Sequence, residues 1–178
     1  MRVFIGCSSK NHYDHITREV AASLAKEGYD LVFGAASFGM MGLCYEEFLK
    51  ENREITSITV SEYEEDLKNI NSTKEFLCDN TFLRTSRIYE NSDVLVFLPG
   101  GSGTVNELFS ILEELRTRES SKQLILYNVP YKEGYYYDFF EQLMQRFIED
   151  GYNDHSIKNY YQYAYDTKEL VKKIGGRI

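Results

Sequence analysis

The segment DVLVFLPGGSGTVNE, residues 93–107, decides the fold that this sequence predicts. It begins with a run of apolar side chains at residues 94–98, which is typical of a short strand buried on both faces of a parallel sheet. Pro99 ends the run, and a glycine-rich turn follows. Apolar residues then recur at helical spacing, at Leu108, Ile111, Leu112 and Leu115. The segment therefore predicts a strand, a turn and a helix over residues 104–118, in that order.

The glycine-rich turn is a candidate site for an anion. Glycine has no Cβ, so a ligand can approach the main chain closely and several N–H groups can converge on it. The first N–H groups of a helix are unpaired, and the helix dipole favours negative charge beside them. A phosphate group fits both properties. The residues predicted to bind it are Gly100, Gly101, Ser102, Gly103 and Thr104.

Strands alternate with helices on both sides of this segment. The patterns predict strands at residues 2–7, 30–33, 55–60, 94–98 and 123–129, with an edge strand at 161–165. They predict helices at residues 16–28, 43–50, 83–91, 104–118, 137–148 and 168–174, the last with capping-box spacing at Asp166 and Glu169. Residues 61–78 are polar and acidic and are expected to be the least regular part. We expect one α/β domain over residues 1–178, a Rossmann-like, doubly wound and mostly parallel sheet with helices on both faces.

Ligands of such sheets bind outside the carboxyl ends of the strands, where the strand order reverses. The loop at Ser8, the glycine-punctuated turn at residues 34–42 and the turn at residues 100–104 would all lie on that edge. Neither glycine-rich turn fits a common nucleotide fingerprint. GxGxxG requires a glycine where Asn106 stands, and GAASFGMMG lacks the ending of a Walker loop. The sequence therefore disfavours a dinucleotide cofactor and an ATPase.

Composition limits the partners further. The net charge of −8 argues against a broad surface for nucleic acid or for an anionic membrane. No apolar run approaches the roughly 20 residues of a membrane span, and residue 2 already begins a strand, without a signal-peptide pattern. We therefore expect a cytoplasmic protein. The three cysteines, Cys7, Cys44 and Cys78, lie far apart and form no CxxC pair, which favours reduced thiols.

Four stretches resemble the LOG family, the cytokinin riboside 5′-monophosphate phosphoribohydrolases that are often labelled possible lysine decarboxylases. PGGSGTVNE, residues 99–107, resembles the family signature PGGxGTxxE. FGAASFGMMG, residues 33–42, is similar to YGGGxxGLMG with two glycines replaced by Ala35 and Ala36. VFIGCSS at the start resembles VFCGSS, and NVPYKEGYYYDFFEQL resembles NVDGYYNSLLxFI. The resemblance covers roughly residues 3–152, in the family's order.

The resemblance places the family's catalytic glutamate on Glu107 and its catalytic arginine on Arg84. Around that arginine the chain departs from the family, with Thr85 in place of a lysine and Phe82 in place of a histidine. Arg87 lies one helical step from Arg84 and could share or take over its role. Ser8 and Gly39, in the other two loops of the edge, are further candidates to bind the nucleotide.

These residues suit hydrolysis of an N-glycosidic bond without a metal or an organic cofactor. The reaction passes through an oxocarbenium-like state at the ribose, which a nearby carboxylate stabilises or assists by activating water. Glu107 would follow the phosphate-binding turn on one rigid helix, and an arginine could bind phosphate or ribose hydroxyls, or polarise the departing base. The competing structural interpretation is a capping box, in which Thr104 begins the helix and Glu107 only bonds its first amide.

Two classes of function remain open. The first is a phosphoribohydrolase that converts a nucleoside 5′-monophosphate to a free base and ribose 5-phosphate. The second is a carrier similar to the molybdenum cofactor carriers, which hold a phosphorylated pterin without turnover. Glu107 separates them, because a pure carrier has little need of a carboxylate beside an anion. A glycosyl transferase of the nucleoside 2-deoxyribosyltransferase type is a third possibility. From the LOG resemblance and the aromatic content we also expect a homodimer.

Overall fold

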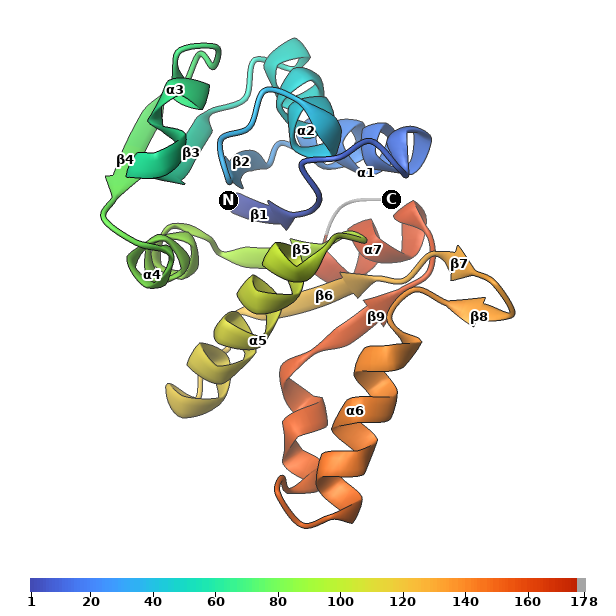
Figure 1. The fold of residues 1–178 in the computed structure, drawn as a ribbon. Helices are drawn as coiled ribbons and strands as arrows, with labels where there is room; N and C mark the ends of the chain where they lie inside the picture. The colour runs from blue at the N-terminus through green and yellow to red at the C-terminus, as the bar shows by residue number, and fades with distance from the viewer. Residues whose placement is uncertain (176–178) are drawn as a thin grey trace.

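The computed structural model describes residues 1–175 and contains a seven-stranded sheet in which every neighbouring pair is parallel (Figure 1). Its strand order is β4-β3-β2-β1-β5-β6-β9. The strands are β1 (Arg2–Gly6), β2 (Asp30–Phe33), β3 (Ile55–Val60), β4 (Lys74–Cys78), β5 (Val94–Phe97), β6 (Gln123–Tyr127) and β9 (Gln162–Ala164). A short antiparallel hairpin of β7 (Pro130–Tyr131) and β8 (Gly134–Tyr135) stands apart from the sheet.

Helices cover both faces of the sheet, which confirms the doubly wound α/β prediction. One face carries α1 (Asp14–Lys26), α2 (Gly39–Lys50) and α7 (Thr167–Ile174). The other carries α4 (Thr81–Asn91), α5 (Ser102–Thr117) and α6 (Asp138–Glu149). The short helix α3 (Glu64–Leu67) and the 3₁₀ turns η1 (Ser61–Tyr63) and η2 (His155–Tyr160) complete the connections.

Two hydrophobic cores form because successive side chains of a strand point to opposite faces. In β1, Val3 and Ile5 pack under α1 and α2, whereas Phe4 packs under α4 and α5. The same alternation in β5 sends Val96 to the first core and Phe97 to the second. β5 therefore carries apolar residues at every position, as the run at residues 94–98 predicted.

The strand order reverses between β1 and β5, at the centre of the sheet. From β1 the chain adds β2, β3 and β4 on one side, and β5, β6 and β9 on the other. Phe4 of β1 stands beside Leu95 of β5, and Gly6 stands beside Phe97. The loops that leave these two strands are therefore neighbours at the carboxyl edge. This is the place where an open α/β sheet binds its ligands.

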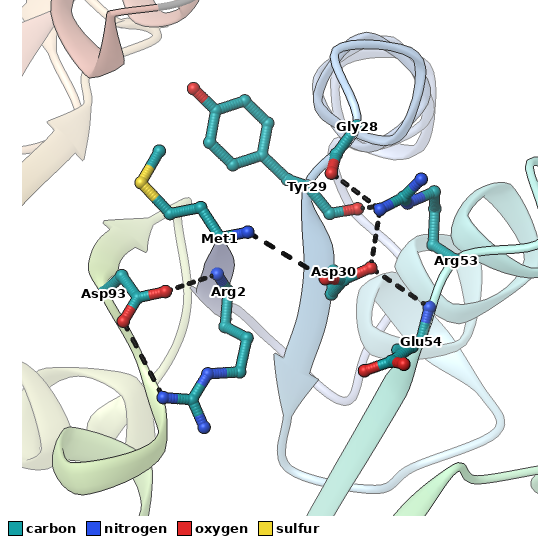
Figure 2. A network of polar contacts seen from close by, with 8 residues as sticks. All are labelled: Met1, Arg2, Gly28, Tyr29, Asp30, Arg53, Glu54 and Asp93. Atoms are coloured by element: carbon teal, nitrogen blue, oxygen red, sulfur yellow. Dashed lines mark hydrogen bonds and ion pairs between the residues drawn. The ribbon is translucent and has the colours of Figure 1, made fainter.

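The opposite, amino-terminal edge is held by a network of polar contacts (Figure 2). Arg53 donates to the Asp30 carboxylate at 2.8 Å and to the backbone carbonyls of Gly28 and Tyr29 at 2.7 and 2.8 Å. The backbone N–H of Arg2 donates to Asp93 at 2.7 Å, immediately before β5. These contacts join the starts of β1, β2, β3 and β5, so the polar groups of this edge are largely used in holding the sheet.

Several local predictions were wrong. Residues 61–78, expected to be irregular, contain the edge strand β4. Helix α2 begins at Gly39 and not at residue 43. Helix α5 begins at Ser102, with Gly101 as its N-cap, so Thr104 is not a cap and the capping-box interpretation of Glu107 fails. At α7, the Asp166 carboxylate caps the helix by accepting from the backbone N–H of Glu169. The Glu169 carboxylate, however, accepts from the backbone N–H of Tyr165 and not from that of Asp166, so the capping box is incomplete.

The predicted edge strand and final helix are present, as β9 and α7. The three cysteines are buried thiols. Among residues 1–175, no helix is both long enough and apolar enough to cross a bilayer.

Candidate active site

A pocket of about 430 Å³ opens at the carboxyl edge of the sheet, where the strand order reverses. Its walls come from segments far apart in the sequence, among them the loop after β1, the turn after β2, α4 and the start of α5. Residues 101–104 form one wall, and Arg84 and Glu107 lie beside them. The pocket thus has the position that the topology predicts for a ligand site.

The start of α5 presents free hydrogen-bond donors to this pocket. Helix α5 follows the Gly101 N-cap, and no side chain caps it. The N–H groups at the start of an α-helix have no intrahelical acceptor, so those of Ser102 and Gly103 remain available for a ligand. Both residues are exposed and line the pocket. The positive end of the helix dipole adds to their attraction for an anion.

Glu107 lies one turn further along α5 and forms a buried ion pair with Arg84 of α4. The Arg84 Nη1 donates to Glu107 Oε1 at 2.6 Å, and their side chains are 20% and 10% exposed. Arg84 Nε also donates to the Ile58 carbonyl of β3 at 3.1 Å. This second bond fixes the guanidinium between two elements. A carboxylate and an arginine from different parts of the chain therefore lie together beside the glycine-rich turn.

Burial changes the acidity of Glu107. Removal from water disfavours a charged carboxylate and raises the pKa of Glu107 above its ordinary value, while the charge and hydrogen bond of Arg84 act in the opposite direction. The net shift is upward. A carboxyl group whose pKa is raised toward neutrality is a better general base than an ordinary surface glutamate.

Gly34, at the end of β2, makes room for the arginine. A Cβ on this residue would overlap Arg84 Nη2 and would stand 3.1 Å from Met41 Sδ. The guanidinium therefore occupies space that any side chain at residue 34 would take. The glycine of the turn after β2 has a definite role here, which is to admit Arg84 to the pocket.

The rest of that turn is tightly built against the loop after β1. Gly39 has φ of 63°, and a Cβ on it would overlap the backbone of Ser9. Ala35 also takes the left-handed conformation, with φ of 62°, which costs about 1–2 kcal/mol for a residue with a Cβ. Gly39 does not line the pocket. It lets α2 begin close to the loop that carries Ser8.

The structure brings together most, but not all, of the predicted site residues. Ser8, Gly101, Ser102, Gly103 and Thr104 line the pocket with Arg84 and Glu107. Gly100 does not line this pocket, and its carbonyl accepts a hydrogen bond from the Tyr136 hydroxyl. Arg87 points elsewhere. It donates to Glu90 at 3.1 Å and lies over the Phe76 ring, so the geometry favours Arg84 of the two arginines.

Sequence reasoning missed several residues of the pocket, among them Asp66 and three larger side chains. Lys10 follows Ser8 in the first loop, Phe38 precedes the start of α2, and Tyr63 belongs to η1. Phe38 is 52% exposed and Tyr63 62%, so aromatic rings stand at the pocket where a planar base could contact them. The glycine-rich context of Phe38 was a usable signal, whereas nothing in the acidic segment around Tyr63 marked it.

Comparison with known proteins gives a family match and named relatives. The model of the family described as possible lysine decarboxylase matches residues 41–174, well over half of the chain. The chain is 28% identical over 177 residues to cytokinin riboside 5′-monophosphate phosphoribohydrolase LOG1 of Arabidopsis thaliana, covering 97% of this chain and 80% of that protein. It is 27% identical over 180 residues to the probable enzyme LOGL2 of Oryza sativa subsp. japonica, covering 97% and 71%.

Solved structures share the fold at lower identity. TM1055 superposes with a TM-score of 0.68 at 20% identity, covering 98% of both chains. The molybdenum cofactor binding protein of Rippkaea orientalis also gives 0.68, at 16% identity, covering 98% of this chain and 93% of that one. At these identities the superpositions establish the architecture alone.

Proposed function

The chain belongs to the possible lysine decarboxylase family, in which the named LOG relatives are phosphoribohydrolases, and on that premise we propose that it hydrolyses a nucleoside 5′-monophosphate. The products are a free base and ribose 5-phosphate. The observation that carries the proposal is the Arg84–Glu107 pair, which lies one helical turn from a set of free backbone donors.

In the proposed complex, the 5′-phosphate binds at the start of α5. Ser102 and Gly103 supply backbone N–H groups, and the Lys10 ammonium adds positive charge from the facing loop. Because Glu107 belongs to the same helix, the phosphate and the carboxylate are held at a fixed separation. Binding the phosphate therefore positions the ribose against the reacting groups.

The Glu107 carboxylate acts as the general base. It accepts a proton from a water molecule, whose oxygen bonds to C1′ of the ribose while the C1′–N bond breaks. The electron pair of that bond leaves with the base, which takes up a proton. Positive charge develops on the ribose during this step, and a carboxylate nearby lowers its energy. Arg84 partly offsets the effect of burial on the pKa of the carboxylate and contributes hydrogen-bond donors to ribose or base.

A panel of nucleoside monophosphates and the matching nucleosides tests the proposal, with release of ribose 5-phosphate or ribose as the readout. We expect turnover of at least one monophosphate and none of its nucleoside, because the anion site needs the phosphate. Equal turnover of AMP and adenosine would contradict the role given to α5.

The variant Glu107→Gln tests the role of the carboxylate. It keeps the shape of the side chain and can still hydrogen-bond to Arg84, but it cannot accept a proton from water. We expect monophosphate affinity within about threefold of wild type and turnover lowered on the order of 100-fold. A fully active variant eliminates the catalytic role of Glu107. Tight binding with no turnover by wild type itself favours the carrier alternative.

A further inference from the structure

A second pocket, of about 380 Å³, adjoins the glycine-rich turn at Pro99, Gly100 and Gly101. Its lining includes Tyr13, just before α1, and Tyr131 and Tyr136, from the hairpin and the segment after it. We call it the tyrosine pocket. It lies outside the Arg84–Glu107 site, and the proposed hydrolysis makes no use of it.

The two pockets meet at the phosphate-binding turn. Ser8, Lys10 and Gly101 line both of them. A phosphate bound at the start of α5 would therefore stand between the pockets, with the ribose directed toward Glu107 on one side. A group attached to another oxygen of that phosphate would extend into the tyrosine pocket.

The walls of the tyrosine pocket suit an aromatic ring. The Tyr136 ring has edge contacts with Tyr13 and Tyr131, at centroid distances of 6.4 and 6.0 Å. The Tyr136 hydroxyl donates to the Gly100 carbonyl, which fixes this ring against the turn. Tyr131 remains 46% exposed, so part of its surface is available to a ligand, and the Lys132 ammonium lies over its ring at 5.2 Å from the centroid. Planar aromatic groups bind to such surfaces by stacking or edge contact.

The junction between the pockets suits a second negative charge. Within residues 1–175, the Lys10 ammonium makes no ion pair, although it lines both pockets. His12 adds an imidazole on the side of the tyrosine pocket. A diphosphate bridge would place one phosphate on the start of α5 and the next within reach of these groups.

We propose that the tyrosine pocket binds the second nucleoside of a dinucleotide whose two halves are joined through a diphosphate. The inference rests on the proposed function, since it takes the 5′-phosphate to bind at α5 with its ribose toward Glu107. It extends the ligands of the site from nucleoside monophosphates to nucleotides that carry an aromatic group beyond the phosphate.

Calorimetric titration with AMP, ADP and di(adenosine-5′) diphosphate tests this inference. The titrations use the Glu107→Gln protein, in which turnover does not disturb the heats, and are repeated with wild type. We expect the dinucleotide to bind about tenfold or more tightly than ADP, because the second adenine gains contacts that ADP lacks. In the Tyr131→Ala protein this gain should disappear while AMP affinity stays unchanged.

The matched control is Tyr165→Ala, which removes another tyrosine of similar exposure, 48%, outside both pockets. It should leave the dinucleotide gain intact. Dinucleotide affinity no greater than that of ADP would overturn the inference alone, provided that AMP binds. An equal loss of AMP and dinucleotide affinity in Tyr131→Ala would overturn it as well. Failure of AMP and dinucleotide alike to bind would overturn the proposed function with it, whereas an active Glu107→Gln protein would overturn only the hydrolytic role.

Discussion

Burial and the charge of Arg84 have opposite effects on the pKa of Glu107. The carboxylate is almost completely buried, and burial alone would favour its protonated form. The guanidinium opposes that tendency at 2.6 Å. Sequence reasoning named both residues but could not pair them, because they are 23 positions apart and belong to different helices. The surrounding residue types carried no signal for their contact, which only the packing of α4 against α5 creates.

The pH dependence of turnover should report this balance. Glu107 must be ionised to accept a proton, so kcat/KM should rise with pH through a pKa above the ordinary value of 4.5. Arg84→Met removes the charge that holds the pKa down, and the acidic limb should then move to higher pH while the maximal rate falls. A pH–rate profile of both proteins measures the shift. An unmoved limb in Arg84→Met would show that the arginine does not control the carboxylate.

Gly34→Ala should lower activity with little loss of stability. The added methyl overlaps Arg84 Nη2, the far end of a flexible side chain that can move away, so the fold tolerates it. The displaced guanidinium, however, no longer meets Glu107 correctly. We expect turnover to fall about tenfold or more, since displacements near 1 Å cost up to about 100-fold. Steady-state kinetics and a thermal melt measure the two effects.

A double-mutant cycle provides the control for Gly34. If the methyl acts only through the arginine, adding Gly34→Ala to Arg84→Met should cost almost nothing further. Additive losses in the double variant would mean that the glycine matters for another reason.

At the level of elements, the apolar patterns predicted the interior strands and failed at the edges. β1, which is apolar from Val3 to Ile5, and β5, which is apolar throughout, were recognised, although their ends differ by one residue. β4 was missed because an edge strand is exposed, and KEFLC shows neither a continuous apolar run nor turn residues. The start of α2 was predicted four residues too late, because its first turn contains Gly39 and Gly42 and glycine is a poor helix former. Both glycines lie so close to other backbone atoms that a Cβ would overlap them.

The long-range contacts of the segment between β6 and α6 could not be predicted from local sequence patterns either. Tyr137 is the N-cap residue of α6, and its hydrogen bonds reach residues that are distant in the sequence. Its hydroxyl donates to the Leu98 carbonyl at 2.7 Å, and its backbone N–H donates to Asn128 at 2.7 Å. Both bonds are buried. They attach the start of α6 to the residues that directly follow β5 and β6, beside the glycine-rich turn.

Tyr137→Phe should destabilise the protein by about 1–3 kcal/mol, because it leaves the Leu98 carbonyl buried without that partner. Chemical denaturation followed by circular dichroism measures the free energy of unfolding. Tyr152→Phe is the matched control, since this tyrosine is 78% exposed and its hydroxyl is not buried. We expect the control to change stability by less than about 0.5 kcal/mol. Similar effects of the two substitutions would contradict the anchoring role.

At the scale of the whole molecule, the two ends of the parallel strands differ. Polar groups at the amino ends bind one another, whereas backbone donors at the carboxyl ends remain available to a ligand. At the amino edge, Arg53, Asp30 and Asp93 use their charges within the fold (Figure 2). At the carboxyl edge, backbone donors of α5 have no capping side chain. The sequence predicted which edge would bind a ligand, because that follows from the direction of parallel strands. The strand order, by contrast, depends on contacts among distant segments, which no local pattern specifies.

Large apolar side chains are exposed in the first turn of α4 and at the pocket, and we propose that they form a homodimer contact. Phe82 is 85% exposed and Leu83 49%, and both directly precede Arg84 in α4. Phe38 and Tyr63, at the pocket itself, are also more than half exposed. Side chains of this kind are costly to leave in water and are enriched at the centres of protein interfaces. A second copy of the chain that packed on these side chains would remove them from water.

Light scattering at micromolar concentration should therefore give about twice the monomer mass of 20.8 kDa. Phe82→Asp places a charge at the centre of the proposed contact and should shift the mass toward that of the monomer. Tyr152→Asp, an equally exposed aromatic position beyond the end of α6, should leave the dimer intact. A wild-type monomer contradicts the proposal outright, and a dimer insensitive to Phe82→Asp places the contact elsewhere. If the dimer encloses the active site, the monomeric variant should also lose turnover, and nucleotide should restore the dimer by binding to that form alone.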